Sequence, residues 1–268
     1  MHEKHPAFLE PDSNAMIWRY MDFPKFVSLL DKKALFFAKA NILFDKFEGT
    51  LPEYNVKMRE QMYEKRDKSA SVPIEELTQP IRKQLERMKQ STLINGWHIN
   101  EYESAAMWDL YSNRRMGIAI QSKYERLANS FEQNKVDVIW IGKVKYIDFK
   151  KVWINELHLY EAFIDKRTSF EHEHELRAVV CLPEGDLGNP NKDELYGIKR
   201  LPATSDGKID SAQLTDRGKY IQTDLDTLIE QIYVSPLAEQ WFTETVKSLV
   251  TKFGFNKEIT KSELYDLH

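Results

Sequence analysis

Short strand-like runs recur along the whole chain, and helical stretches of uneven length separate them. The strand-like runs cover residues 16–20, 35–40, 93–98, 117–122, 138–146, 175–182 and 229–234. Helical patterns begin at residue 22 and then cover 53–91, 103–112, 124–131, 153–165 and 238–253. A doubly wound fold needs a regular alternation of strand and helix, which this order lacks. We therefore expect an α+β fold with a mixed or antiparallel central sheet and flanking helices.

The ends of the chain and its longest helical stretch define the expected layout. Residues 1–15 contain Pro6 and Pro11 and predict a flexible N-terminal lead, which leaves 16–268 as a single α+β domain. The stretch 53–91 predicts a helical insertion between two core strands. Its charged faces are either solvated or a surface for a protein partner. Within it, Pro80 is expected to break or kink the helix.

Composition excludes several classes of site. The chain has 10 glycines and no G-x-G-x-x-G or G-x-x-x-x-G-K motif, so a glycine-rich phosphate loop is not expected. With 38 Lys and Arg against 42 Asp and Glu, the net charge of −4 does not indicate a nucleic-acid binder. The single cysteine, Cys181, excludes an internal disulfide and a CxxC zinc framework, so no structural metal is expected. Without an apolar leader or span, we expect a cytoplasmic protein that does not contact a membrane.

The densest polar cluster is the segment 166–177, KRTSFEHEHELR. If it forms a strand, Glu171, Glu173, Glu175 and Arg177 share one face, and the three carboxylates require a metal, a cationic ligand or arginines nearby. If it forms a helix, the same residues make ordinary i,i+4 pairs at the surface. Spacing alone leaves both readings open.

Two aromatic motifs are candidates for binding a planar ligand. Trp97 and His98 precede a predicted helix that carries Trp108 and Tyr111, and these residues are either ligand contacts or core. The second motif, Trp18-Arg19-Tyr20, places an arginine inside an aromatic strand. If Arg19 is buried it needs a partner, and the available ones are Asp45, Glu48, the glutamates of 171–175 or an anionic ligand.

In order along the chain, these motifs are WRY (18–20), LFF (35–37), DKFEG (45–49), WH (97–98), ESAAMW (103–108), GIAI (117–120), KR…FEHEHELR (166–177) and IYVSP (232–236). This order resembles the bacterial domain-of-unknown-function family 2971 (DUF2971) over residues 16–255. The chain departs from that pattern at Lys46, where the family usually has proline, and at Gly96-Trp97-His98, where it often has a Cys-Phe-Ser-like strand end. The resemblance brings little settled function.

The layout is also similar to ADP-ribosyltransferase-like domains, and this similarity implies a function and a site. It implies a nucleotide-binding enzyme that transfers or hydrolyses the ADP-ribose unit of NAD, of a bacterial toxin or phage-defence type. By this analogy Glu173 or Glu175 is catalytic, because a carboxylate stabilises the ribosyl cation. The residues expected to bind NAD are Arg19, Tyr20, Phe37, Trp97, His98, Trp108, Tyr111 and Arg177.

Two alternatives remain open at this point. In the first, Asp45, Glu48 and the glutamates of 171–175 hold Mg²⁺ or Mn²⁺ in a metal-dependent nuclease or phosphohydrolase. In the second, the chain is a non-catalytic recognition domain, its aromatic residues are core, and its charged residues form a structural ion network. The positions of Arg19, Trp108 and Glu175 relative to one another distinguish these readings.

Overall fold

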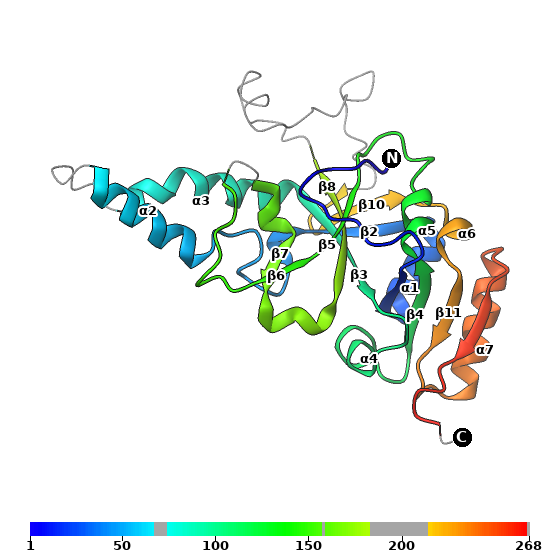
Figure 1. The fold of residues 1–268 in the computed structure, drawn as a ribbon. Coiled ribbons are helices and arrows are strands. Elements are labelled where there is room, and N and C mark those ends of the chain that lie inside the picture. Colours follow the sequence, from blue (N-terminus) through cyan, green and yellow to red (C-terminus); the bar gives the residue numbers. More distant parts are fainter. Residues whose placement is uncertain (67–73, 157–158, 183–213, 267–268) are drawn as a thin grey trace.

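A computed structural model describes residues 1–66, 74–156, 159–182 and 214–266 (Figure 1). Its main sheet consists of β1 Met16–Asp22, β2 Ala34–Lys39, β3 Thr92–Ile99, β4 Gly117–Lys123, β5 Trp140–Lys143, β8 Glu175–Cys181, β9 Leu214–Thr215, β10 Gly218–Gln222, β11 Gln231–Val234 and β12 Glu258–Lys261. Its strand order is β12-β11-β4-β1-β3-β2-β10-β9, with β8 beside β3 and β5 beyond β8. The β11–β12 pair is parallel and the other pairs in this sheet are antiparallel. The fold is therefore α+β with a mixed central sheet, as the pattern of runs predicts.

Strand β3 is the branch point of the sheet. On one edge β8 pairs with it along its length, from Thr92 to His98. On the other edge β1 pairs with its end, at His98 and Ile99, and β2 with its beginning, at Leu93 and Ile94. Between these two pairings, side chains link β3 to β1 and β2. The Arg19 guanidinium of β1 donates to the Gly96 carbonyl of β3, and Asn95 of β3 donates to the Phe36 carbonyl of β2 over 2.8 Å.

One face of the sheet carries the main hydrophobic core. It is covered by α1 Phe23–Lys32, α5 Tyr124–Asn129, α6 Leu225–Leu228 and α7 Gln240–Lys252, whose buried residues pack against strand residues such as Ile17 and Leu93. The ends of these helices follow local rules. Asp22 caps α1 by accepting from the Lys25 N–H, and Gly254 follows α7 with φ +81°.

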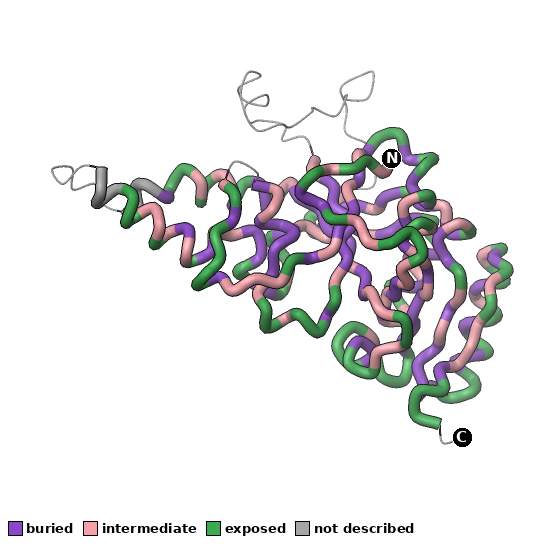
Figure 2. Tube along the Cα trace, in the orientation of Figure 1, coloured by how far each residue is buried: buried purple, intermediate pink, exposed green. Residues whose placement is uncertain are grey.

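The opposite face carries two smaller cores and most of the polar motifs. It is covered by α3 Ile74–Ser91, α4 Ala105–Tyr111, the 3₁₀ helices η2 Leu159–Phe163 and η3 Thr168–Glu173, and the two-stranded ribbon of β6 Lys145–Ile147 and β7 Asp165–Arg167. Figure 2 shows that the buried segments follow the sheet, whereas the outer turns of the helices are exposed. A further short 3₁₀ helix, η1 Ala40–Ile42, follows β2.

Helices α2 Glu53–Arg66 and α3 lie between β2 and β3 in the sequence and project from the body of the protein (Figure 1). Pro80 is expected to break or kink the helix, and it does not break it, because α3 runs through Pro80. The loss of one backbone donor is offset where the second half of α3 packs Leu85 and Met88 into the core.

The segment predicted to be a flexible lead lies along β5: the Met1 amino group donates to the Asp137 carbonyl over 2.5 Å, and Phe8 is buried against Gly142. Two other expectations differ from the structure. The predicted strand 138–146 is two strands, because the chain turns at Val144 from the main sheet into the ribbon. Of the predicted helix 153–165, residues 153–156 are not helical, residues 157–158 lie outside the described residues, and the remainder contains η2 and the start of β7.

Candidate active site

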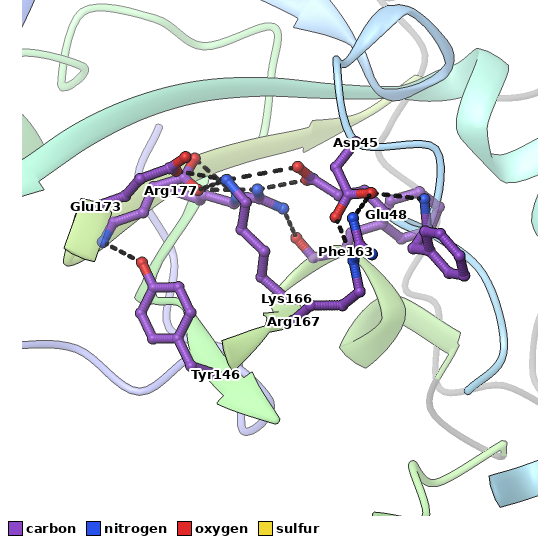
Figure 3. A network of polar contacts seen from close by, with 10 residues as sticks. Asp45, Glu48, Tyr146, Phe163, Lys166, Arg167, Glu173 and Arg177 are labelled. Carbon is purple, nitrogen blue, oxygen red and sulfur yellow. Dashed lines mark hydrogen bonds and ion pairs between the residues drawn. The ribbon is translucent and has the colours of Figure 1, made fainter. Parts of the chain in front are cut away.

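A network of buried charges lies where β8 begins, on the polar face of the sheet (Figure 3). Glu175 is the first residue of β8. Its carboxylate accepts a bidentate pair of hydrogen bonds from the Arg177 guanidinium, with Nε–Oε1 and Nη2–Oε2 distances of 2.9 Å. Lys166 Nζ lies 3.1 Å from Glu175 Oε2. Burial alone would raise the pKa of Glu175, but Arg177 and Lys166 lower it overall. Glu175 is therefore held as a carboxylate, with 14% of its side chain exposed.

Lys166 and Arg177 join two further carboxylates to this pair. Lys166 Nζ contacts Glu173 Oε2 and lies 3.6 Å from Glu48 Oε1, while Arg177 contacts Glu48 and donates to the Phe163 carbonyl. Burial acts to lower the pKa of Lys166, and the surrounding carboxylates raise it overall. Arg177 is 1% exposed and its pKa is raised for the same reason. Both cations are therefore permanently charged parts of the network.

Arg19 approaches the network from the other face of the sheet. Strand alternation places it beside Ile17, and its guanidinium lies 5.9 Å from the centre of the Trp97 ring and donates to the Gly96 carbonyl. Burial lowers the pKa of Arg19 to about 10, and attraction to Glu175 acts in the opposite direction. Arg19 therefore places a third cation near Glu175, in addition to Lys166 and Arg177.

The turn that leads into β8 is held by side chains from two other strands. His174 has a left-handed backbone, φ 38°, between the end of η3 and β8. The His98 Nδ1 lies 2.6 Å from the Glu173 carbonyl oxygen, and the Tyr146 hydroxyl accepts from the Glu175 N–H over 2.7 Å. These bonds fix the main chain on both sides of His174, and with it the direction in which Glu175 leaves the turn.

The segment 45–49 supplies a second ion pair beside the first. Asp45 accepts two hydrogen bonds from the Arg167 guanidinium, at 2.8 and 3.1 Å. This guanidinium lies between two rings, 4.2 Å from the centre of Phe47 and 5.3 Å from that of Phe170. The sequence analysis offers Asp45 and Glu48 as partners of Arg19. These two carboxylates bind other cations, because Asp45 pairs with Arg167, and Glu48 with Arg177 and Lys166. Of the other partners proposed for Arg19, the glutamates of 171–175, Glu175 is the one that attracts it.

Aromatic side chains border the network on the side of α4. The Tyr20 ring meets Trp108 edge to face with centres 5.0 Å apart, and Trp108 Nε1 donates to Glu103 over 2.9 Å. Burial, followed by the charges of the nearby Glu173 and Glu175 carboxylates, raises the pKa of the Tyr111 hydroxyl. Burial lowers the pKa of His98. Its Nε2 atom is buried and has no hydrogen-bond partner among the described residues.

Most of the predicted site residues share one region, but two do not. The residues on or beside the polar face are Tyr20, His98, Trp108, Tyr111, Glu173, Glu175 and Arg177, and Arg19 reaches toward Glu175 from behind. Phe37 and Trp97 are corrections: both lie in the main core on the opposite face, Phe37 against Phe131. Alternation along β2 and β3 points these rings away from the network.

The cluster 166–177 is not one continuous strand. Residues Thr168–Glu173 form η3, so Glu171 does not share a strand face with Glu175 and Arg177. The roles of Lys166 and Tyr146 were not predicted from the sequence. Lys166 belongs to the charged cluster 166–177, and its position in that cluster is a signal for its burial among the glutamates. Tyr146 gave no signal, because its contact joins separate strands.

Two other features, a metal-binding group of side chains and a membrane-spanning helix, are absent from the part of the chain that the structure describes. No group of three or more His, Cys, Asp and Glu residues there is arranged to hold a metal ion. Within the network the carboxylates are bound by Lys166 and Arg177 instead. No helix in the described ranges is both long and apolar enough to cross a membrane.

The comparisons with known proteins give a weak likeness. No family model and no curated protein matches the chain. Two solved structures of Thermus sp. 2.9 DarT are similar to it. The complex with NAD⁺ is 8% identical, with 94% of this chain and 97% of that chain covered and a TM-score of 0.35. The complex with ADP-ribosylated single-stranded DNA is 9% identical, with 95% and 97% covered and a TM-score of 0.35. This TM-score assigns the chain to no family, and we base its function on the residues of the site.

Proposed function

We propose that this protein cleaves the nicotinamide–ribose bond of NAD and passes the ADP-ribose unit to an acceptor or to water. The observation that carries the proposal is the state of Glu175: an ionised carboxylate, partly exposed, beside a second carboxylate and a row of aromatic side chains. Cleavage of this bond builds positive charge on the ribose, and a fixed carboxylate stabilises that charge more strongly in a partly buried site than in water. Glu175 is the proposed catalytic residue.

The roles of the other site residues depend on whether their polar atoms are already bonded within the protein. Arg19 keeps its charge at neutral pH, because its pKa of about 10 is well above 7. It lies on the face opposite the network and donates to the Gly96 carbonyl, so its contact with NAD stays a prediction from the sequence. The nicotinamide ring of NAD would lie beside four side chains, those of Tyr20, His98, Trp108 and Tyr111. Arg177 has a different role from the predicted one: its buried guanidinium binds Glu175, Glu48 and the Phe163 carbonyl, so it holds Glu175 in place and does not contact NAD.

A second candidate, the non-catalytic recognition domain, is supported by one specific observation. Glu175 accepts hydrogen bonds from both Arg177 and Lys166, so its charge is already compensated within the protein. In that case the network stabilises the fold, and replacing its members changes stability alone. Membership of DUF2971 and a role in a bacterial toxin or in phage defence remain predictions from the motifs.

The test is the release of nicotinamide from NAD by the purified protein. We expect Glu175→Gln to lower the rate at least about 100-fold, because the amide cannot stabilise a cation. The matched control is Glu171→Gln, which replaces an exposed glutamate of the same segment and should keep the wild-type rate. The proposal is wrong if the wild-type protein releases no nicotinamide, modifies no protein or nucleic acid, and shows no thermal shift with NAD. A Glu175→Gln variant with normal turnover would favour the recognition domain.

A further inference from the structure

The Tyr146 hydroxyl is the hydrogen-bond acceptor for the main chain of Glu175. Its oxygen lies 2.7 Å from the Glu175 nitrogen. Figure 3 shows the Tyr146 ring at the edge of the network, with a dashed line from its hydroxyl oxygen. Tyr146 belongs to β6, which pairs with β7 in the separate ribbon and not with the main sheet. A side chain of the ribbon therefore reaches the first residue of β8.

The same segment also binds the other polar group of the Glu175 main chain. The Val144 N–H donates to the Glu175 carbonyl over 2.8 Å, at the point where the chain leaves β5 for β6. On the β3 side, Ile99 N–H donates to the His174 carbonyl over 2.9 Å. Glu175 thus takes its backbone bonds from the link between main sheet and ribbon, and its neighbour His174 from β3.

The left-handed conformation of His174 makes the position of Glu175 depend on the hydrogen bonds that hold this turn. A residue other than glycine at φ 38° persists only where its surroundings hold it. The Tyr146 bond acts directly after that residue, and Arg177 and Lys166 bind only the carboxylate at the far end of the side chain. Loss of the hydroxyl would free the start of β8 while the charge partners of Glu175 stayed in place.

We infer that Tyr146 is a positioning residue for Glu175, which sets the carboxylate through the main chain and does not itself contact the reacting atoms. This inference rests on the proposed function for its catalytic consequence, but its structural part can be measured without activity. The hydroxyl stays protonated at neutral pH, because burial and then the neighbouring carboxylates raise the pKa of Tyr146. Its role is therefore that of a neutral acceptor for the amide.

Tyr146→Phe tests the inference, because it removes the oxygen and keeps the ring. We expect hydrogen exchange at the Glu175 amide, followed by NMR, to become about 10-fold faster, while the Ala178 amide in the middle of β8 keeps its rate. In NAD cleavage we expect kcat to fall about 3- to 10-fold with KM within about twofold, since the bond orients the carboxylate and binds no substrate. Tyr220→Phe is the control, because its hydroxyl hydrogen-bonds Ser28 of α1 over 3.1 Å and belongs to β10.

The outcomes separate this inference from the proposed function. If wild-type protein does not cleave NAD, the proposed function fails, and the amide exchange still decides whether Tyr146 fixes Glu175. Unchanged exchange at Glu175 in the variant overturns the inference. Faster exchange with a wild-type kcat, in a protein that cleaves NAD, overturns the positioning role as well.

Discussion

Gly96→Ala probes the fit between β3 and the Glu175 carboxylate. A methyl group at this position would lie 2.8 Å from Glu175 Oε1 and 3.6 Å from its Cδ. Carbon and oxygen atoms do not approach so closely, so the carboxylate must move by about 0.5 Å. The bond from Arg177 Nε to Oε1, now 2.9 Å, then exceeds ordinary hydrogen-bond length.

The cost follows from the kind of bond that is lost. A hydrogen bond between charged groups contributes about 1.5–3 kcal/mol to stability. Replacing a strand glycine by alanine returns about 0.5–1 kcal/mol of backbone entropy. We therefore expect Gly96→Ala to lower the free energy of unfolding by about 1–2 kcal/mol.

Urea denaturation of a double-mutant cycle identifies the source of this loss. In a Glu175→Ala background the new methyl group meets no carboxylate, so the same substitution should be neutral or slightly stabilising. The coupling free energy between the two positions should then be about 1.5–3 kcal/mol. If Gly96→Ala costs the same in both backgrounds, the crowding does not involve Glu175, and the account of this pair is refuted.

Three further predictions concern the surroundings of Glu175. Lys166→Met removes the ammonium group from among three carboxylates and should cost about 3–5 kcal/mol in urea unfolding, and a loss below about 1 kcal/mol would contradict a buried network. Burial raises the pKa of Asp165 from 3.8 to about 7, so the folded protein retains a proton that the unfolded chain releases. Stability from this group is complete below about pH 4 and is lost as the pH rises through 7. The free energy of unfolding of Asp165→Asn, measured relative to wild type, should therefore increase by as much as about 4 kcal/mol from pH 4 to pH 8. Parallel stability curves of the two proteins over this pH range would disprove the pKa shift of Asp165. Tyr111→Ala, which removes a ring that is 47% exposed beside the carboxylates, should raise KM for NAD about tenfold with little change in unfolding, and an unchanged KM would remove Tyr111 from the site.

The features that the sequence predicted well depend on neighbouring residues. The start of α1 at Asp22 and the end of α7 before Gly254 each follow from a capping residue and an apolar stripe. The strand-like runs were found for the same reason, since alternation or a short apolar run is visible within a few residues.

The features that were missed depend on which face of the sheet a residue joins and on distant contacts. Alternation along β3 separates Trp97 from His98, but it does not say which side carries the charges. The ion pair of Lys166 with Glu48 joins segments more than a hundred residues apart, and no local sequence pattern predicts it. The site could therefore be predicted as a set of residue types near 173–177, but not as the closed network that binds them.

The branch point at β3 also governs the order in which this protein can fold. His98 pairs with Trp18, 80 residues earlier, and with Glu175, 77 residues later. During synthesis, β1 to β4 can associate while one edge of β3 still lacks its partner. Contacts this distant in sequence fold slowly, and an uncovered central strand is a template for aggregation. Until β8 has been synthesised, Glu48 has no arginine partner and one hydrogen-bonding edge of β3 has no neighbouring strand, so the surroundings of β3 are complete only once residues 175–181 are present.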